Sequence, residues 1–340
     1  MDRRRDSTWR LHVPQTTIVN RQQGPEMSRA HNSAPLTTDP RTVSVIMPCF
    51  NHARFIRESV RGVLSQQHKS VELIIVDDCS SDDSWNVITD LAAADSRIRP
   101  IRHDRNGGAA KSRNDGITAA TGDFIAFCDA DDIWEPEKLA RQVALLDRNT
   151  DCDVAYCDSF LIDGNGTLTG QRFSELFPPP PAPSGPLFAQ LVRTNFINTQ
   201  GVLIRRSCVT RVGLFDEDLK GASVEDWWYW IQLSREHRFV YSEECLGRYR
   251  VHSGSSGVPR TYSVSRYKVF RRMLEAYTDL PIEVRARALL EMGVELCRLG
   301  RMRTGRRVLW SAMAASVTHP NAYPTAARAL RQFVVRTVLQ

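Results

Sequence analysis

The chain joins an apolar run to a cluster of acids in one stretch, Phe124-Ile125-Ala126-Phe127-Cys128-Asp129-Ala130-Asp131-Asp132. Its first four residues predict a short buried strand. Three further predicted strands precede it, at residues 43–47, 71–76 and 98–101, and predicted helices lie between them. Strands that alternate with helices at this spacing predict right-handed crossovers and a parallel sheet, and therefore an α/β fold.

Polar residues directly follow three of these predicted strands. Asn51 follows the first strand, Asp77 and Asp78 follow the second, and Asp129 and Asp131 follow the fourth. In open parallel sheets, ligands bind beyond the carboxyl ends of the strands. The sequence therefore predicts a ligand site at this edge of the sheet.

The acids of residues 129–132 indicate what such a ligand carries. Three carboxylates this close repel one another unless a positive charge lies between them. Mg²⁺ and Mn²⁺ commonly share one or two carboxylates with the phosphates of a substrate. A helix cap before Pro136 is the alternative interpretation. The position at the end of a strand gives the metal and the helix cap about equal weight.

Two further groups of residues suit a nucleotide. The Asp77-Asp78 pair can accept hydrogen bonds from a base or a ribose, or can cap the following helix. Gly107, with Lys111 and Arg113 after it, places flexible backbone and two cations at a helix start, which suits a diphosphate. The chain has neither the GxxxxGK[ST] loop nor a GxGxxG fingerprint after the first strand. ATP-binding and nicotinamide-binding classes therefore lose their main support.

A third cluster lies further along the chain. Glu225 and Asp226 open the aromatic run of residues 227–230. Acids at a helix start are common partners of the helix dipole, but Asp226 is also a candidate general base. Four aromatics in a row cover more than one helix face, so we expect some to border a cavity or the surface, where a sugar ring can stack. His252 is either a packed core histidine or part of the site.

Taken in chain order, six stretches resemble the family-2 glycosyltransferases. They are residues 45–51, 74–80, 106–114, 127–132, 225–227 and 249–252. Together they span about residues 42–256. The resemblance implies the GT-A fold, a Rossmann-like α/β fold with a mostly parallel central sheet that binds nucleotide-diphospho-sugars, here with a C-terminal helical extension.

The resemblance also implies a role for each matching residue. Asp226 is the expected catalytic base, and Asp131 and Asp129 are the expected ligands of Mn²⁺ or Mg²⁺. The nucleotide is expected to contact Pro48, Asn51, Asp77, Asp78, Gly107, Lys111, Arg113 and Asp129. The acceptor or diphosphate is expected near Glu225, Trp227, Arg250 and His252.

The implied reaction is inverting transfer of a single sugar from a nucleotide-sugar, with UDP as the expected nucleotide. The acceptor is a hydroxyl of a glycan or lipid-linked glycan, in cell-surface polysaccharide or glycolipid biosynthesis. No QxxRW-type motif follows residues 225–226, which favours single transfer over polymerisation. The alternatives are a catalytically degenerate GT-A scaffold and a sugar-nucleotidylyltransferase. The latter needs a glycine-rich loop after the first strand, and residues 47–51 are not one.

Charge and sequence texture divide the chain into three regions. Residues 1–40 lack apolar periodicity and predict a disordered leader. Residues 41–258 form the predicted GT-A domain, and residues 42–259 hold 23 Lys and Arg against 30 acids. Residues 259–340 form a predicted basic helical extension, with fifteen Lys and Arg against five acids and helical patterns at 284–299 and 303–315.

These regions bear on the partners and the location of the chain. Its composition, 42% apolar and 25% charged, is typical of a globular protein, and no run reaches the roughly 18 apolar residues of a membrane span. We expect a cytoplasmic protein. The acidic middle argues against nucleic acid as a partner, because it repels phosphates. The basic extension suits peripheral contact with an anionic membrane, at the inner face of the plasma membrane, or is simply a set of solvated helix faces.

Overall fold

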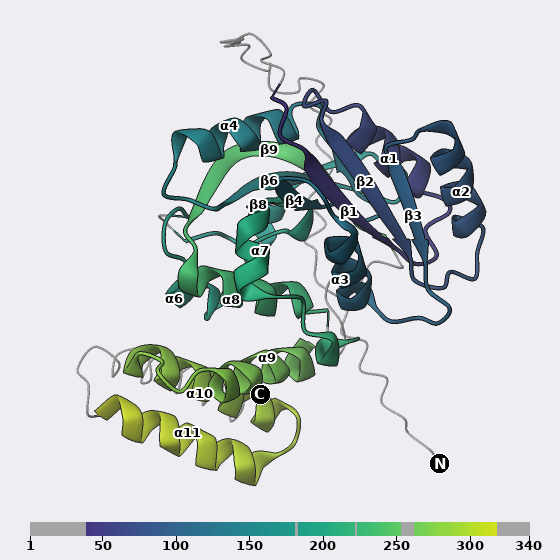
Figure 1. The fold of residues 1–340 in the computed structure, drawn as a ribbon. Coiled ribbons are helices and arrows are strands. Elements are labelled where there is room, and N and C mark those ends of the chain that lie inside the picture. Colours follow the sequence, from purple (N-terminus) through teal and green to yellow (C-terminus); the bar gives the residue numbers. More distant parts are fainter. Residues whose placement is uncertain (1–38, 181–182, 222, 253–261, 318–340) are drawn as a thin grey trace, which may run out of the picture. The chain divides into compact units, whose positions relative to one another are not determined.

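The computed structural model describes residues 39–180, 183–221, 223–252 and 262–317. The leader predicted over residues 1–40 therefore lies outside the described residues except for its last two. The part of the basic extension beyond residue 317 also lies outside them. Within the described residues, strands and helices alternate through the first half of the chain, as predicted (Figure 1).

Nine strands join into one sheet in the described part of the chain. They are β1 (Val43–Cys49), β2 (Val71–Asp77), β3 (Ile98–Arg102), β4 (Phe124–Phe127), β5 (Ile133–Trp134), β6 (Val154–Ile162), β7 (Leu168–Arg172), β8 (Val202–Arg205) and β9 (Phe239–Arg250). Their order is β3-β2-β1-β4-β8-β6-β9-β5, and β7 pairs with β6. The first four strands in this order are parallel, β8 is antiparallel to both of its neighbours, and β6 and β9 are parallel.

The register of the parallel half brings the strand ends together. Cys49 of β1 lies opposite Asp77 of β2, and Ile46 lies opposite Phe127 of β4. The loops that begin at Phe50, Asp78 and Cys128 therefore leave the same edge of the sheet. This confirms the predicted clustering of the polar residues that follow these strands.

Helices cover both faces of the sheet (Figure 1). They are α1 (Ile56–Leu64), α2 (Ser84–Ala94), α3 (Ala109–Ala119), α4 (Lys138–Arg148), α5 (Phe173–Leu176), α6 (Phe188–Leu191), α7 (Arg206–Val212) and α8 (Glu225–Glu236). Val45 and Met47 pack on the side of α1, α2 and α4, whereas Ile46 packs on the side of α3 and α8. Because both faces are buried there, the centres of β1, β2 and β4 are continuous apolar runs, whereas the edge strand β3 is mostly exposed.

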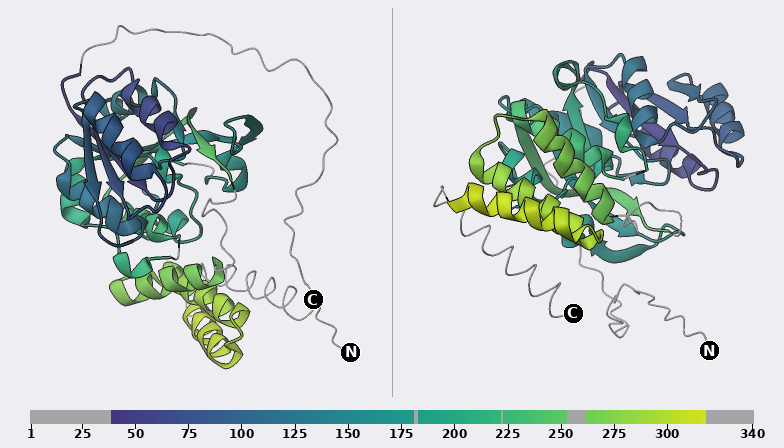
Figure 2. Two further views of the ribbon diagram at one scale, coloured as in Figure 1. Left: turned by 90° about the vertical axis from the view of Figure 1, so that its right-hand side faces the viewer. Right: turned by 90° about the horizontal axis from the view of Figure 1, so that it is seen from below.

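The C-terminal region adds α9 (Tyr262–Ala276), α10 (Ile282–Arg298) and α11 (Met302–Val317). The last two match the predicted helical pair, and Gly300 between them has a φ of 76°, which suits glycine. Figure 2 shows α10 and α11 lying side by side. The domain boundary at residue 258 stays a prediction. Val269, Phe270 and Met273 of α9 are buried in one cluster with side chains of α8, so α9 contacts the preceding region.

The aromatic run of α8 is one of those contacts. Its rings are buried, with Trp227 2% and Trp228 3% exposed and the next two fully buried. Phe270 of α9 lies 5.6 Å from Trp227, and Tyr277 lies 5.8 Å from Trp228, between ring centroids. The expectation that some of these rings border a cavity or the surface is therefore wrong. Helix α9 covers the side of α8 that does not contact the sheet.

Candidate active site

The loop after β4 carries the acids of residues 129–132, and the end of β9 holds it in place. The side chain of Arg250 donates through Nε to the carbonyl oxygen of Asp131 at 2.6 Å. The backbone N–H of Arg250 donates to Oδ1 of Asp132 at 2.8 Å. Two residues further on, Nε2 of His252 lies 3.0 Å from Oδ2 of Asp131. Arg250, predicted near a diphosphate, is 2% exposed and fastens this loop.

Three side chains at this edge could hold a metal ion. His52, Asp131 and His252 each offer a ligand atom, and these atoms all lie within 4.8 Å of one another. Asn51, at a φ of 59°, turns the chain after β1, and the N–H of His52 then donates to Ser84 Oγ at 2.9 Å. Nδ1 of His52 is buried without a hydrogen-bond partner among the described residues. Carboxylate oxygen and imidazole nitrogen fit a divalent ion such as Mn²⁺.

Asp129, the other predicted metal ligand, has a different partner. Arg113 of α3 donates through one terminal nitrogen to Asp129 Oδ1 at 3.1 Å and through the other to Glu225 Oε1 at 2.8 Å. Its guanidinium side chain is 6% exposed. Burial lowers the pKa of Arg113, but the neighbouring carboxylates outweigh this effect and hold the pKa above its usual value. Arg113 therefore joins the β4 loop to the start of α8.

Asp226 follows Glu225 on α8. Its Oδ2 accepts hydrogen bonds from Thr199 Oγ1 at 2.9 Å and from Asn195 Nδ2 at 3.3 Å. Its Oδ1 accepts from the N–H of Trp227 at 2.6 Å. Burial, and then the charge of Glu225, raise the pKa of Asp226 to about 6. A carboxylate with a pKa near neutrality is suited to accept a proton in catalysis.

Asp78 lies at the end of β2 and is 3% exposed. Its two oxygens accept from the N–H groups of Gly107 at 2.6 Å and Gly108 at 2.7 Å, and Oδ1 also contacts Nδ1 of His103 at 2.8 Å. The backbone groups expected to face a diphosphate are thus turned toward Asp78. The alternative that Asp78 caps a helix is wrong for α2, which begins at Ser84. Contact between Asp78 and a nucleobase stays a prediction.

The other predicted nucleotide ligands surround this loop. Asp77 is fully buried, and its Oδ1 has no hydrogen-bond partner among the described residues. Pro48 is paired within β1 and β2. Oδ1 of Asn51 accepts from the N–H of Ser81 at 2.8 Å. Lys111 is partly exposed, and its Nζ lies 2.9 Å from Asp115.

Trp227 does not line this site. Its indole N–H donates to the carbonyl oxygen of Leu191 at 2.7 Å, and its ring contacts Phe270. With a ring that is 2% exposed, Trp227 can shape the acceptor site only by packing α8 behind Asp226, and this predicted role stays a prediction. Its ring is used to pack α8 against α9.

The family of the chain follows from a comparison with known proteins. Residues 44–210 match the family model described as glycosyl transferase family 2. This chain is a member of that family. Glu225, Asp226, Arg250 and His252 lie beyond the matched segment, and the fold brings them to the same edge as the loops inside it.

Individual relatives agree with this assignment. The glycosyltransferase is 27% identical over 239 residues to TuaG of Bacillus subtilis, named for teichuronic acid biosynthesis, with 70% of this chain and 88% of TuaG covered. Two other relatives, 35% and 31% identical, match over 52% and 35% of their own lengths. The chain thus spans about half or less of those two.

Solved structures show the same GT-A fold. Residues 1–349 of S. aureus TarS, in complex with UDP-GlcNAc, match with a TM-score of 0.59 and 18% identity, over 86% of this chain and 92% of that one. The mannosyltransferase PcManGT of Pyrobaculum calidifontis, in complex with GDP-Man and Mn²⁺, matches with a TM-score of 0.51 and 19% identity, over 90% and 78%. The α/β fold class predicted from the sequence is confirmed.

Three functional candidates of this glycosyltransferase were missed from the sequence. His52 directly follows Asn51 at the end of the first strand, and that position was a usable signal. Asn195 and Thr199 lie in a segment without strand or helix periodicity, and only the fold shows that they contact Asp226. No local pattern could have identified them.

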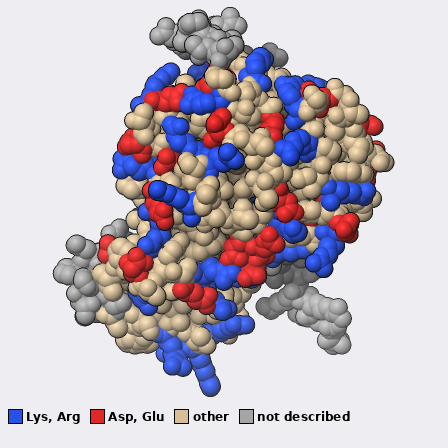
Figure 3. Space-filling view, viewed as in Figure 1, with Lys and Arg blue, Asp and Glu red and all other residues tan. Residues whose placement is uncertain are grey.

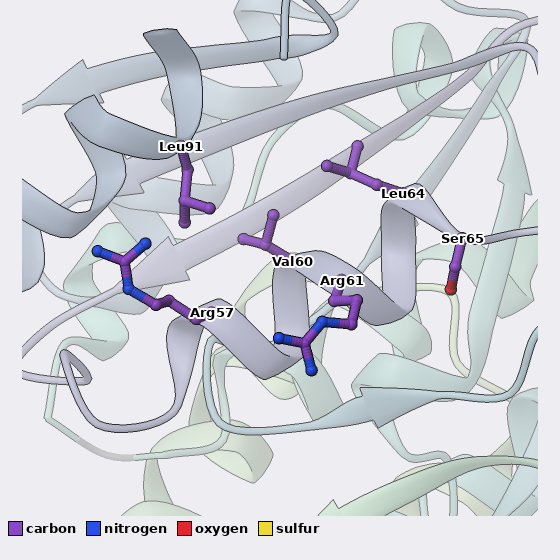
Figure 4. A pocket seen from close by; sticks show the side chains of 6 residues that line it. All are labelled: Arg57, Val60, Arg61, Leu64, Ser65 and Leu91. Atoms are coloured by element: carbon purple, nitrogen blue, oxygen red, sulfur yellow. The ribbon is translucent and has the colours of Figure 1, made fainter. Parts of the chain in front are cut away.

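The glycosyltransferase also has a surface hollow between α1 and α2 (Figure 4). It is lined by Arg57, Val60, Arg61, Leu64, Ser65 and Leu91. None of the candidate site residues is among them. The hollow therefore has no part in the chemistry considered for this edge of the sheet.

Proposed function

We propose that this glycosyltransferase moves a single sugar, with inversion, from a UDP-sugar to an acceptor hydroxyl. The observation that carries the proposal is the bridge made by Arg113. It connects Asp129 of the acidic loop to Glu225, and so puts Asp226 in the same site although 97 positions separate Asp129 from Asp226. A donor-binding loop and a proton acceptor are the two parts that sugar transfer requires.

The comparisons support the class of donor and product. TarS has been solved with UDP-GlcNAc and PcManGT with GDP-Man, so both of these fold relatives bind nucleotide-sugars. TuaG is named for the synthesis of a cell-surface polymer. We therefore propose a glycan or lipid-linked glycan acceptor, and a role in cell-surface polysaccharide or glycolipid biosynthesis.

The chemistry assigned to Asp226 is general base catalysis. The acceptor oxygen attacks the anomeric carbon and forms the new C–O bond, while its proton passes to a carboxylate oxygen of Asp226. The bond from the anomeric carbon to the diphosphate breaks, and the nucleoside diphosphate leaves with the electron pair. Attack opposite the leaving group inverts the anomeric configuration. Thr199 and Asn195 fix the carboxylate for this step.

Asp131 and His252, with His52, would hold the divalent ion. When bound, Mn²⁺ or Mg²⁺ neutralises charge on the departing diphosphate. Arg250 fixes the loop on which Asp131 lies, and Arg113 keeps a buried positive charge beside it. Asp129 acts through Arg113 in this proposal, rather than as a ligand of the ion.

The acceptor class bears on where the reaction occurs. No helix among the described residues is both long and apolar enough to cross a membrane. We propose that the chain works in the cytoplasm, with peripheral contact to the inner face of an anionic membrane. Nucleic acid is not among the proposed partners.

The test is a transfer assay with the full chain, a panel of nucleotide-sugars and Mn²⁺, in which release of the nucleoside diphosphate is followed. We expect turnover with one UDP-sugar, loss of Mn²⁺-dependent nucleotide binding in Asp131→Ala, and retained nucleotide binding without turnover in Asp226→Asn. Asp90→Asn, at an exposed carboxylate on α2, is the matched control and keeps full activity.

Three outcomes would contradict the proposal. A folded chain that binds and turns over no nucleotide-sugar is a scaffold. Release of pyrophosphate from a nucleoside triphosphate and a sugar phosphate identifies a nucleotidylyltransferase. A product with retained anomeric configuration, read by NMR, excludes the single displacement.

A further inference from the structure

One face of α11 combines arginines with an exposed indole. Arg303, Arg306 and Arg307 are exposed, and Trp310 is 66% exposed. Residues three and four apart lie on the same side of a helix, so Arg303, Arg307 and Trp310 form one stripe with Arg306 beside it. We call these four residues the α11 stripe.

The opposite face of α11 is already occupied. Leu309 and Ala312 are buried and pack in one cluster with Leu290 and Cys297 of α10. Gly305 lies against the same helix, because a Cβ at this position would meet the backbone of α10 near Cys297. The α11 stripe is therefore the outward face of a packed helix, and the exposure of Trp310 comes from this orientation.

The charge of this face has one sign. The sequence of α11 contains no Asp or Glu. Among the described residues, no carboxylate forms an ion pair with Arg301, Arg303, Arg306 or Arg307, whereas Arg298 in the preceding turn is paired with Glu295. Lys and Arg side chains project from the lower edge of the view in Figure 3, where α11 lies. The face suits an anionic partner.

We propose that the α11 stripe binds the surface of an anionic lipid bilayer. Arginines near such a surface are attracted to its headgroups, and an indole between them lies at the depth of the headgroups. The inference rests on the proposed function in one respect, since a lipid-linked acceptor requires the enzyme at the membrane.

A second copy of the chain fits this face less well. A two-fold contact through the α11 stripe would place three arginines against the same three arginines, and no acid of α11 would separate them. An anionic bilayer supplies the missing negative charge and also an apolar boundary for Trp310. The two occupants give different results in solution and on vesicles.

The test is co-sedimentation of the full chain with vesicles of phosphatidylcholine containing 30% phosphatidylglycerol, against vesicles of phosphatidylcholine alone. We expect binding to the anionic vesicles only, weakened by salt. Each arginine near an anionic surface strengthens binding about fivefold. The triple variant Arg303→Glu, Arg306→Glu and Arg307→Glu therefore loses at least about 100-fold in affinity, and Trp310→Ser about tenfold.

The matched control has the same change in net charge at other places. It reverses three exposed arginines of α1, α4 and α7, namely Arg61, Arg148 and Arg211. We expect this variant to bind the anionic vesicles within a factor of about three of the unchanged chain. Equal weakening of the two triple variants would show that net charge alone acts, and would overturn the assignment to α11.

Two further results would overturn the proposal. The unchanged chain could fail to bind anionic vesicles at low salt, or Trp310→Ser could convert a dimer in solution to a monomer, which would make this face an interface between copies. Thermal stabilisation by UDP and Mn²⁺ is measured in parallel on every variant and should not change. If the unchanged chain binds UDP and Mn²⁺ but not anionic vesicles, only the membrane surface is contradicted. If the unchanged chain binds no nucleotide, the proposed function is contradicted.

Discussion

Replacing Asp226 by Asn should abolish transfer and at the same time stabilise the fold. Ionised Asp226 is held where burial and Glu225 disfavour its charge, and its pKa rises from 3.8 to about 6. At 1.36 kcal/mol per pKa unit, this shift costs the folded state about 3 kcal/mol when the carboxylate is ionised. Asn carries no charge and removes that cost.

Replacing the carboxylate by an amide also removes a hydrogen-bond acceptor. Oδ2 of Asp226 accepts two hydrogen bonds, from Thr199 and Asn195, and an amide nitrogen at this position cannot accept both. One lost hydrogen bond costs about 1 kcal/mol. The expected net gain at pH 8 is therefore about 2 kcal/mol, or roughly 4 °C in melting temperature for a domain of this size.

The sign of the pH dependence follows from the raised pKa. The folded state binds this proton more tightly than the unfolded state, so the cost of ionisation is fully present above about pH 6 and disappears below about pH 4. The stability gain of Asp226→Asn should shrink from about 2 kcal/mol at pH 8 to under about 1 kcal/mol at pH 5. Transfer by the unchanged chain should decline as the pH falls through about 6.

Urea unfolding at the two pH values measures the stability difference, and the transfer assay measures the rate, which should fall by about two to four decades in Asp226→Asn. Asp90→Asn, at a side chain that is 70% exposed, should change stability by less than about 0.5 kcal/mol. The reasoning is refuted if Asp226→Asn is less stable than the unchanged chain at pH 8, or if its gain is the same at both pH values.

Three other substitutions test different parts of the site and of the packing beside it. Arg113→Ala leaves Asp129, which is 29% exposed, and Glu225, which is 13% exposed, without their cation and should cost about 1–3 kcal/mol in urea unfolding, with Arg113→Lys recovering part of it. Gly201→Ala would put a Cβ 2.6 Å from the carbonyl oxygen of Cys157, and we expect a loss of about 1–3 kcal/mol in the same assay; an unchanged midpoint would contradict the close packing. His52→Ala should weaken Mn²⁺ binding in the presence of UDP by about tenfold or more, measured by electron paramagnetic resonance, and equal affinity would remove His52 from the ligand set.

The parallel half of the fold could be predicted from the sequence because its strands are buried on both faces. Runs such as residues 73–76 are apolar throughout, and the end of this strand follows from the first polar residue after them, Asp77. β9 is different, since it alternates between buried and exposed segments and carries Glu243 and Glu244 in its middle. Its pairing with β6 also shifts register, and no short-range pattern encodes either feature.

Some residues of the candidate site could likewise be predicted from the sequence, and others could not. Asp131, Arg113 and Asp226 lie in local motifs and could be named from the sequence, and their contacts follow from a sheet whose strands end at one edge. The partners of Asp226 could not be named, since Thr199 and Asn195 reach it from a separate loop. The orientation of Trp227 could not be predicted either, because the helix that covers it begins 35 positions later.

That covering helix changes what counts as the smallest working enzyme. A shortened chain ending at residue 258 keeps every residue that was assigned a role in transfer, but it loses Phe270 and the rest of α9. The backbone N–H of Trp227 donates to Asp226, and without α9 one side of the Trp227 ring would be exposed to water. Shortening the protein to the segment that holds its motifs would therefore disturb the catalytic base Asp226. Any engineered or evolved shortening of this enzyme has to end after α9.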